Sequence, residues 1–397
     1  MHLNTVGPGP ATQPAAASAL GFYVHVPYCS ARCGYCDFNT YVPGEDGHST
    51  RQDWLAAATT EIDRAADALG SQRRVETVFV GGGTPTLLPP ADLGEVLTRI
   101  DDRIGLAADA EITVEANPET LNPEVLSGLR AAGFTRISIG MQSGDPQVLA
   151  VLDRQHTPGG AVRAAELAAD AGFEQVSLDL IYGTPGETLS SWRDSLTAAL
   201  SAGVGHISAY ALKVEQGTAL FRRVRSGQIA AVDDDYAAAA YEIADDLLTE
   251  AGLSWYEISN WATPGQECRH NLGYWRNADW WGIGPGAHSH LAGRRWWNER
   301  NPQVWSSALA AKRDPRAGEE ELTQEQLTTE LLMLGLRLPA GLSAEQIDAV
   351  ATNQDWQTTA TRLREQGLLL DAEPLRLTRA GRLLADWVTI ELLEALS

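Results

Sequence analysis

The sequence predicts an α/β fold: an incomplete (β/α)6 TIM-type barrel followed by a small, winged-helix-like C-terminal α+β domain. Three observations support it. From residue 21 onward, short runs of β-branched residues alternate with Ala- and Leu-rich helical patterns, as in βα units with a parallel sheet. Residues able to bind ligands follow the ends of these runs. Beyond residue 320 the pattern changes to Leu-rich helices.

Six runs are candidate strands, at Phe22–Val26, Glu76–Val80, Glu111–Glu115, Arg136–Gly140, Gln175–Leu180 and His206–Leu212. The helices expected between them lie at about 50–69, 91–104, 122–132, 159–171 and 188–202. Asp92, Asn122 and Ser190 are candidate N-caps, because such side chains accept from free N–H groups of a first helical turn. Right-handed crossovers would roll the units into a barrel whose chemistry lies at the carboxyl ends of the strands.

The expected domain organisation has four parts. Residues 1–20 form a disordered tail, 21–300 the barrel with an aromatic-rich extension, 301–320 a charged linker and 321–397 the C-terminal domain. In the last part, Leu-rich helices are expected at 323–337, 343–350, 356–366 and 378–395. Short turn-strand segments at Gly367–Leu370 and Leu375–Leu377 would form a small hairpin between the last two helices.

The composition excludes several classes of function. The chain has 397 residues, of which 30 are basic and 52 acidic, and its net charge of −22 repels phosphate backbones, so no nucleic-acid binding is expected. A run of about 18 apolar residues, the length that spans a membrane, is missing. With four cysteines and no export signal in residues 1–19, we expect a cytoplasmic protein.

Three of the four cysteines lie on one short loop after the first predicted strand. Cys29, Cys33 and Cys36 have three residues between the first pair and two between the second. Three thiolates can hold a metal cluster and leave one coordination position open, whereas a [4Fe–4S] cube normally takes four Cys ligands. Zinc and a disulfide are the alternatives, but structural zinc sites take four ligands and reducing compartments disfavour disulfides. The spacing favours an iron–sulfur cluster.

Polar residues at the ends of the other predicted strands are expected to lie around the same opening of the barrel as the cysteine loop. The second strand runs into the segment Gly81–Thr86, whose three glycines could form a nest of backbone N–H groups around a ligand. A plain Gly-rich turn is the alternative. The remaining strand ends carry Glu115, Gln142, Asp179 and Ala211.

The motifs Tyr-Val-His-Val-Pro-Tyr-Cys, Gly-Gly-Gly-Thr-Pro-Thr, Gly-Met-Gln-Ser and Asp-Leu-Ile-Tyr-Gly-Thr-Pro, with the Cys loop, resemble the radical S-adenosylmethionine (SAM) superfamily over residues 21 to 395. The resemblance is to its anaerobic coproporphyrinogen oxidase-like branch. It implies a [4Fe–4S] cluster on the three cysteines, whose open iron chelates SAM. The SAM contacts it implies are Tyr23, Tyr35, Gly82, Gly83, Thr84, Glu115, Gln142, Arg154, Asp179 and Ala211.

Two kinds of protein share these motifs, the oxidases and haem-binding chaperones of the same fold. The oxidases typically carry another Cys two places after the third cluster ligand, where this chain has Phe38. The chaperone type carries His-Asn-x-x-Tyr-Trp, which matches residues 270–275 here. Both features favour a haem chaperone that delivers haem to haem proteins such as respiratory enzymes. An oxygen-independent coproporphyrinogen III oxidase is the alternative, and a tetrapyrrole methyltransferase a weaker one.

The downstream motif suggests a haem site. Neutral imidazole is a common axial ligand of haem iron, so His270 is the candidate ligand, with Asn271, Tyr274 and Trp275 as pocket residues. A hydrogen-bonded core histidine in an aromatic-rich segment is the alternative. Cys268 could support the site, bind haem or be a buried thiol, and the last of these is the commonest case. A homodimer formed on cluster loading and a peripheral membrane contact of the last helix are further expectations.

Overall fold

The computed structural model describes residues 19–42, 50–70, 73–154, 157, 159–231, 233–352 and 355–396. Its strands are β1 (Leu20–Val26), β2 (Val75–Gly82), β3 (Leu106–Ala116), β4 (Arg136–Gln142), β5 (Gln175–Tyr182), β6 (His206–Ala211), β7 (Ser254–Glu257), β8 (Asn260–Ala262), β9 (Asp279–Ile283), β10 (His288–Leu291), β11 (Arg294–Asn298) and β12 (Arg316–Glu321). These described strands form one sheet in the order β12-β11-β10-β9-β1-β2-β3-β4-β5-β6-β8-β7.

The helices of the first three hundred residues are α1 (Arg51–Leu69), α2 (Pro90–Arg103), α3 (Pro123–Ala131), α4 (Pro146–Val151), α5 (Gly160–Asp170), α6 (Leu189–Ser201), α7 (Ala219–Arg225), α8 (Asp234–Glu250) and α9 (Arg269–Trp275). Those that follow are α10 (Pro302–Ala310), α11 (Gln324–Gly335), α12 (Ala344–Asp348), α13 (Asp355–Glu365), α14 (Arg379–Leu383) and α15 (Ala385–Leu396). Short 3-10 turns lie at Pro85–Leu87 and Pro118–Thr120.

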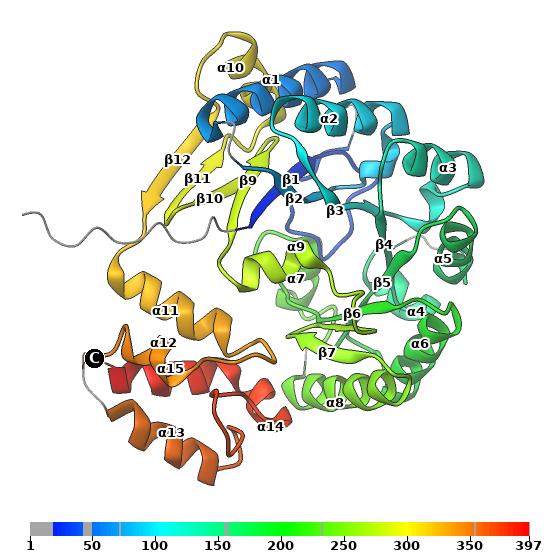
Figure 1. The fold of residues 1–397 in the computed structure, drawn as a ribbon. Helices are drawn as coiled ribbons and strands as arrows, with labels where there is room; N and C mark the ends of the chain where they lie inside the picture. The colour runs from blue at the N-terminus through cyan, green and yellow to red at the C-terminus, as the bar shows by residue number, and fades with distance from the viewer. Residues whose placement is uncertain are drawn as a thin grey trace, which may run out of the picture.

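The six predicted strands are confirmed as a curved parallel sheet that does not close. Neighbouring strands from β1 to β6 pair in parallel, and the helices that follow them cover the outer face, as Figure 1 shows. Buried Val, Ile, Leu and Phe side chains between sheet and helices form the main core. The predicted α/β fold with an incomplete barrel is therefore correct.

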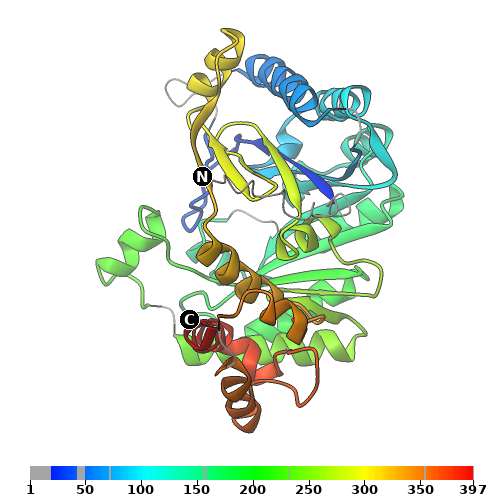
Figure 2. The ribbon, with the colours of Figure 1, turned by 60° about the vertical axis from the view of Figure 1, so that its left-hand side comes forward.

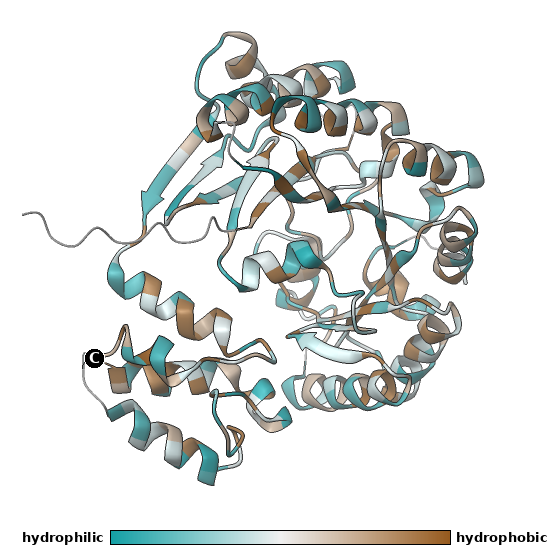
Figure 3. Cartoon of the chain, viewed as in Figure 1, coloured by the Kyte–Doolittle hydropathy of each residue, from teal (hydrophilic) through white to brown (hydrophobic). Residues whose placement is uncertain are grey.

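The strands that extend this sheet at both edges were not predicted. On one side β9 pairs in parallel with β1 and then β10, β11 and β12 follow in antiparallel order. On the other side β8 and β7 extend β6 in antiparallel order. The expected linker 301–320 is consequently wrong as a description, because it contains α10 and the first residues of β12. In Figure 3, most of β12 is coloured hydrophilic, which is why it resembles a linker.

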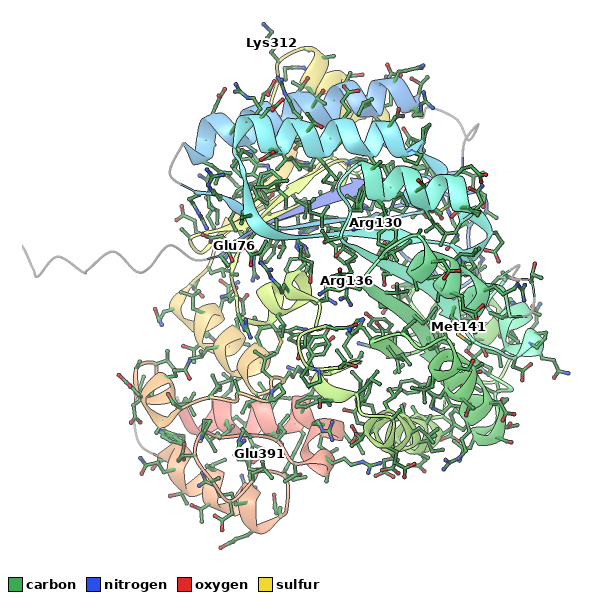
Figure 4. The ribbon with its side chains drawn as sticks, turned by 45° about the vertical axis from the view of Figure 1, so that its right-hand side comes forward. Glu76, Arg130, Arg136, Met141, Lys312 and Glu391 are labelled. Atoms are coloured by element: carbon green, nitrogen blue, oxygen red, sulfur yellow. The ribbon has the colours of Figure 1, made fainter. Side chains whose placement is uncertain are left out.

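Helix α9 occupies the space inside the curve of the sheet (Figure 1). The carboxylate of Glu111 on β3 accepts hydrogen bonds from the backbone N–H groups of Arg269 and His270, at 2.9 and 3.0 Å. A carboxylate at this position satisfies free N–H groups and interacts favourably with the positive end of the helix. The interior also holds Arg136 of β4, which donates to the carbonyl of Gln266 and is shown in Figure 4.

Helices α11 to α15 have a hydrophobic core of their own, and Figure 2 shows them together at one end of the molecule. The predicted hairpin is present only as one isolated antiparallel bridge, Leu369 with Leu377, and a second bridge joins Leu375 to Leu342 outside it. The last helix, expected at 378–395, is two helices that break at Leu384. Leu20 belongs to β1 rather than to the tail, whose residues 1–18 lie outside the described residues.

Of the three predicted N-caps, one is correct. Asn122 accepts from the backbone N–H of Val125 and begins α3. Asp92 lies within the first turn of α2, where Pro89 is the cap, and Ser190 lies within α6, which Thr188 caps. Both errors arise because several residues near each helix start can cap, and only the backbone conformation selects one.

Candidate functional site

The cysteine loop follows β1 and is fixed by backbone hydrogen bonds. Cys29 donates to the carbonyl of Tyr41 at 2.9 Å, and Gly34 donates to the carbonyl of Leu152 at 3.2 Å. All three thiols of the loop are free and partly buried, and burial raises the pKa of Cys36 to about 11. A thiol with so high a pKa stays protonated by itself, so a bound metal would have to displace the proton of Cys36.

The donor set suits an iron–sulfur cluster better than a closed zinc site. Three cysteine sulfurs from one loop are ligands that iron–sulfur clusters use, and they leave one position for a further ligand. Within the described ranges, no three Cys, His, Asp or Glu side chains stand together at metal-binding distances as they lie.

Arg154 joins the cysteine loop to the ends of three strands. Its guanidinium donates to Gln142 Oε1 at 2.9 Å, to Asn117 Oδ1 at 3.0 Å and to the Cys33 sulfur at 3.5 Å. Asn117 in turn donates to Thr84 Oγ1 at 3.0 Å. Five residues from separate parts of the chain thus form one hydrogen-bonded network, which positions a cation beside the thiols.

The expected nest of free N–H groups in the glycine segment is wrong. The backbone N–H groups of Gly82, Gly83 and Thr84 donate to Glu115 Oε2, the Val26 carbonyl and the Tyr28 carbonyl, respectively. Glycine is required at 83 for a different reason, because a Cβ atom there would lie 2.4 Å from the Tyr28 carbonyl oxygen. The segment therefore packs closely on the cysteine loop.

The carboxylates expected to bind a ligand line the interior of the sheet. Both oxygens of Asp179 accept hydrogen bonds, from Ser138 at 2.6 Å and from Ser208 at 2.7 Å. Burial raises the pKa of Asp179, and burial, together with repulsion from Asp179, raises the pKa of Glu115 to about 7. Tyr23 lies near Glu115 and shares a hydrogen bond of 2.9 Å with His25 Nδ1.

The two remaining predicted contact residues lie on the cysteine loop and at the end of β6. Tyr35 packs against the small apolar cluster formed by Val148, Leu152 and their neighbours, next to the cysteine loop. Ala211 is exposed at the end of β6. Most of the predicted residues therefore lie on or just after the strands β1 to β6, and that they bind one ligand stays a prediction.

The structure places His270 in the interior with both ring nitrogens occupied. Its Nδ1 atom lies 2.8 Å from Thr77 Oγ1 and its Nε2 atom 2.9 Å from the Tyr274 hydroxyl, and its ring stacks on Phe79. His270 is 3% exposed, and burial lowers its pKa to about 3. This is the arrangement of a hydrogen-bonded core histidine, the alternative to an iron ligand. Binding iron here would first break a buried hydrogen bond, worth about 1 kcal/mol.

A hollow of about 300 Å³ lies beside this histidine. Its walls include His270, Tyr274 and Trp280, and two arginines, Arg269 and Arg276, stand at its border. Asn271 and Trp275, predicted as pocket residues, are partly buried but do not line it. Cys268 is a buried thiol that donates to Glu111 Oε1 at 3.5 Å, which agrees with the simplest of its three interpretations.

Sequence reasoning missed several residues that organise the site. They are His25, Glu111, Asn117, Ser138 and Ser208. Asn117 had a usable signal, since it follows the end of a predicted strand two residues after Glu115. The serines did not, because a small polar residue inside a strand is common.

Comparison with known proteins shows which families this chain resembles. The Radical SAM superfamily model matches residues 23–199, and the HemN C-terminal domain model matches residues 322–384. The structure of coproporphyrinogen III oxidase (HemN) from Escherichia coli superposes with a TM-score of 0.78, covering 95% of this chain and 90% of that one, at 22% identity. The fold and the cysteine loop thus define a radical SAM protein.

Full-length relatives identify the family more narrowly. The heme chaperone HemW of Mycobacterium tuberculosis (strain ATCC 25618 / H37Rv) is 48% identical over 390 residues, 97% of each chain. The heme chaperone HemW of Bacillus subtilis (strain 168) is 34% identical over 92% of this chain and 97% of its own. The chain belongs to the HemW family of radical SAM proteins.

Proposed function

We propose that this protein is a haem chaperone, which binds haem and delivers it to haem proteins. The supporting observation is its similarity, along the whole chain, to relatives named heme chaperone HemW. A local feature points the same way, since Phe38 is 63% exposed at the place where the oxidases typically carry a further cysteine. Respiratory enzymes are the proposed haem acceptors.

The radical SAM family implies a [4Fe–4S] cluster and SAM. We assign the cluster to Cys29, Cys33 and Cys36, and the open iron position to SAM. The network of Arg154, Gln142 and Asn117 supports this assignment, because a guanidinium beside the cysteines suits the carboxylate of methionine. Glu115 and Asp179 would then accept hydrogen bonds from ribose hydroxyls.

The hollow beside α9 is the proposed place for haem. Flat aromatic side chains at Tyr274 and Trp280 suit a porphyrin face, and Arg269 and Arg276 suit its propionates. The hollow is also lined by Glu76 and Asp279, so its two arginines would bind propionates only by competing with these carboxylates.

Three finer expectations belong to this proposal. Cluster loading would produce a homodimer, which a doubling of mass on reconstitution would show and an unchanged monomer would contradict. A peripheral membrane contact would use α15, where Trp387 and Ile390 are exposed, together with the exposed Leu384 just before it. No helix among the described residues is long and apolar enough to cross a membrane. The free thiols fit a reducing compartment, the cytoplasm.

The rival function is oxidation of coproporphyrinogen III, the activity named for the HemN structure. The reconstituted protein, reduced anaerobically with SAM and coproporphyrinogen, should yield no protoporphyrinogen above the cluster-free control. In parallel, haem-loaded protein should restore an apo haem protein from the same cells faster than free haem does. Multiple-turnover formation of protoporphyrinogen with no haem delivery would replace the chaperone with the oxidase.

A further inference from the structure

The cysteine loop begins at Cys29 and returns to the end of β1 at Tyr41. The N–H of Tyr41 donates to the Pro27 carbonyl at 2.7 Å, and the N–H of Cys29 donates to the Tyr41 carbonyl at 2.9 Å. These two bonds close the base of the loop. Asn39 lies within this base, shortly after the third cysteine, Cys36.

The side chain of Asn39 ties the base of the loop to the antiparallel edge of the sheet. Its Nδ2 atom donates to the carbonyl of Pro285 at 3.0 Å and to the carbonyl of Arg300 at 2.8 Å. Its Oδ1 atom accepts from the Tyr41 hydroxyl at 3.3 Å. Pro285 follows β9 and Arg300 follows β11, so one amide joins segments that are 246 and 261 residues apart in the sequence.

The backbone of Asn39 is held by His25 of β1. His25 Nε2 lies 2.9 Å from the Asn39 carbonyl oxygen, and because a carbonyl only accepts, Nε2 carries the proton. The other ring nitrogen, Nδ1, then accepts from the Tyr23 hydroxyl. Gly82 provides room for the ring, since a Cβ atom there would lie 2.5 Å from the imidazole. The histidine therefore connects the loop base to the strand that precedes it.

The turn that accepts from Asn39 is itself fixed by a buried carboxylate. Glu61 of α1 accepts from the N–H of Gly284 at 2.8 Å and from the amide of Asn298 at 2.7 Å. The same amide donates to the Gly284 carbonyl at 2.9 Å. Both backbone groups of Gly284 are thus occupied, and the next carbonyl, that of Pro285, accepts from Asn39.

Two glycines of this turn allow the loop base to approach so closely. A Cβ atom at Gly286, whose φ is 74°, would lie 2.8 Å from Asn39 Nδ2. A Cβ atom at Gly284, whose φ is 108°, would lie 2.6 Å from the His25 carbonyl oxygen. Both the backbone conformation and the close contact require glycine. The turn is therefore shaped to receive the base of the cysteine loop.

We propose that Asn39 is a positioning residue for the iron–sulfur cluster. The proposal rests on the proposed assignment of the cluster to the three cysteines of the loop. Asn39 does not bind iron; it holds the loop base against the turn after β9, so that the three sulfurs keep one arrangement. Strand β9 then serves both proposed sites, because Trp280 near its start lines the hollow and the turn after its end supports the cysteine loop.

The test uses the full-length protein, reconstituted anaerobically with iron and sulfide. Asn39→Ala should bind iron but release it to a chelator about tenfold faster than the parental protein, as one or two lost hydrogen bonds imply. The EPR spectrum of its reduced cluster should differ from the parental spectrum. Gly286→Ala, which displaces the Asn39 amide from the other side, should change the spectrum as well.

Asn122→Ala is the matched control, because Asn122 caps α3 and makes no contact with the loop base. It should lower the melting temperature and leave iron release and the EPR spectrum unchanged. Equal acceleration of iron release in this control would reduce the effect of Asn39 to general destabilisation and overturn the proposal.

An Asn39→Ala protein with the parental rate of iron release and the parental EPR spectrum would also overturn the proposal. If that variant does not fold, Asn39→Asp is measured in the same way with the same expected outcome, because it keeps the shape and the acceptor for Tyr41 but cannot donate. If the parental protein itself retains no iron after reconstitution, the assignment of the cluster fails, which is a different result from a failure of Asn39 alone.

Discussion

The Nδ1 atom of His270 and the Oγ1 atom of Thr77 lie 2.8 Å apart and join α9 to β2 across 193 residues of sequence. Because Glu111 holds the first N–H groups of the same helix, α9 is fixed at two points inside the curve of the sheet. The motif that suggests haem in the sequence is therefore also part of the protein's core.

Removing the Thr77 hydroxyl should destabilise the protein. Thr77→Val keeps the shape of the side chain but leaves His270 Nδ1 without a partner, which costs about 1–3 kcal/mol. Thr113→Val is the matched control, because Thr113 is also buried in the sheet but its hydroxyl has no partner among the described residues. Urea unfolding should show a lower midpoint for Thr77→Val only, and equal midpoints for the two variants would mean that the contact carries no stability.

Asn117 should matter for SAM although the sequence did not single it out. Asn117→Ala removes the acceptor of Arg154 and the donor to Thr84, so we expect SAM affinity to fall about tenfold, as one or two lost hydrogen bonds imply. Asn117→Asp keeps an acceptor for Arg154, so its SAM affinity should fall less than that of Asn117→Ala. Equilibrium dialysis with the cluster-loaded protein measures this, and Asn117→Ala binding at the parental level would remove the network from the SAM site.

The raised pKa of Glu115 predicts a dependence of stability on pH. The pKa is about 7 in the folded protein against an ordinary value of 4.5, so the folded state binds the extra proton between these values. The contribution of Glu115 to the free energy of unfolding therefore falls as pH rises from about 4.5 to about 7, and it stays lower above pH 7.

Glu115→Gln imitates the protonated form and keeps an acceptor for the Gly82 N–H. It should leave the melting temperature unchanged at pH 5 and raise it at pH 8, by the equivalent of about 1–2 kcal/mol, since Glu115 keeps some contact with solvent. Thermal unfolding of the parental protein and the variant at pH 5 and at pH 8 measures this difference. A variant less stable than the parent at pH 8 would show that the carboxylate is ionised and stabilising.

Three of the four cysteines should be required for iron binding, and the fourth, Cys268, should not. Replacing Cys29, Cys33 or Cys36 by Ala should abolish the cluster absorption and reduce bound iron to background after reconstitution. Cys268→Ala should retain iron at the parental level, because this thiol is buried beside Glu111, away from the loop. Loss of iron in Cys268→Ala from a protein with a native melting curve would contradict the assignment.

Local patterns were sufficient to predict the parallel part of the fold. The β-branched runs gave β1 to β6, and the helices between them end within about one residue of their predicted ends. The antiparallel edges were missed because β7 and β8 are short and β12 reads Arg-Ala-Gly-Glu-Glu-Glu, which has no apolar alternation. What makes β12 a strand is its pairing with β11, and pairing between distant segments leaves no local signal.

The site was predictable to the extent that parallel strands bring their ends together. This rule placed Glu115, Gln142 and Asp179 at one mouth. It could not show that the glycine N–H groups are already bonded within the protein, nor that both nitrogens of His270 are occupied. Such facts depend on side-chain partners far away in the sequence, which spacing does not reveal.

The most direct test of the central claim is an anaerobic haem titration of the reconstituted parental protein. The account predicts saturable binding near one haem per chain, with a Soret band typical of histidine-bound iron, in the same preparation that forms no protoporphyrinogen. Unsaturable haem uptake, with a difference spectrum equal to that of haem added to an unrelated acidic protein, would contradict it.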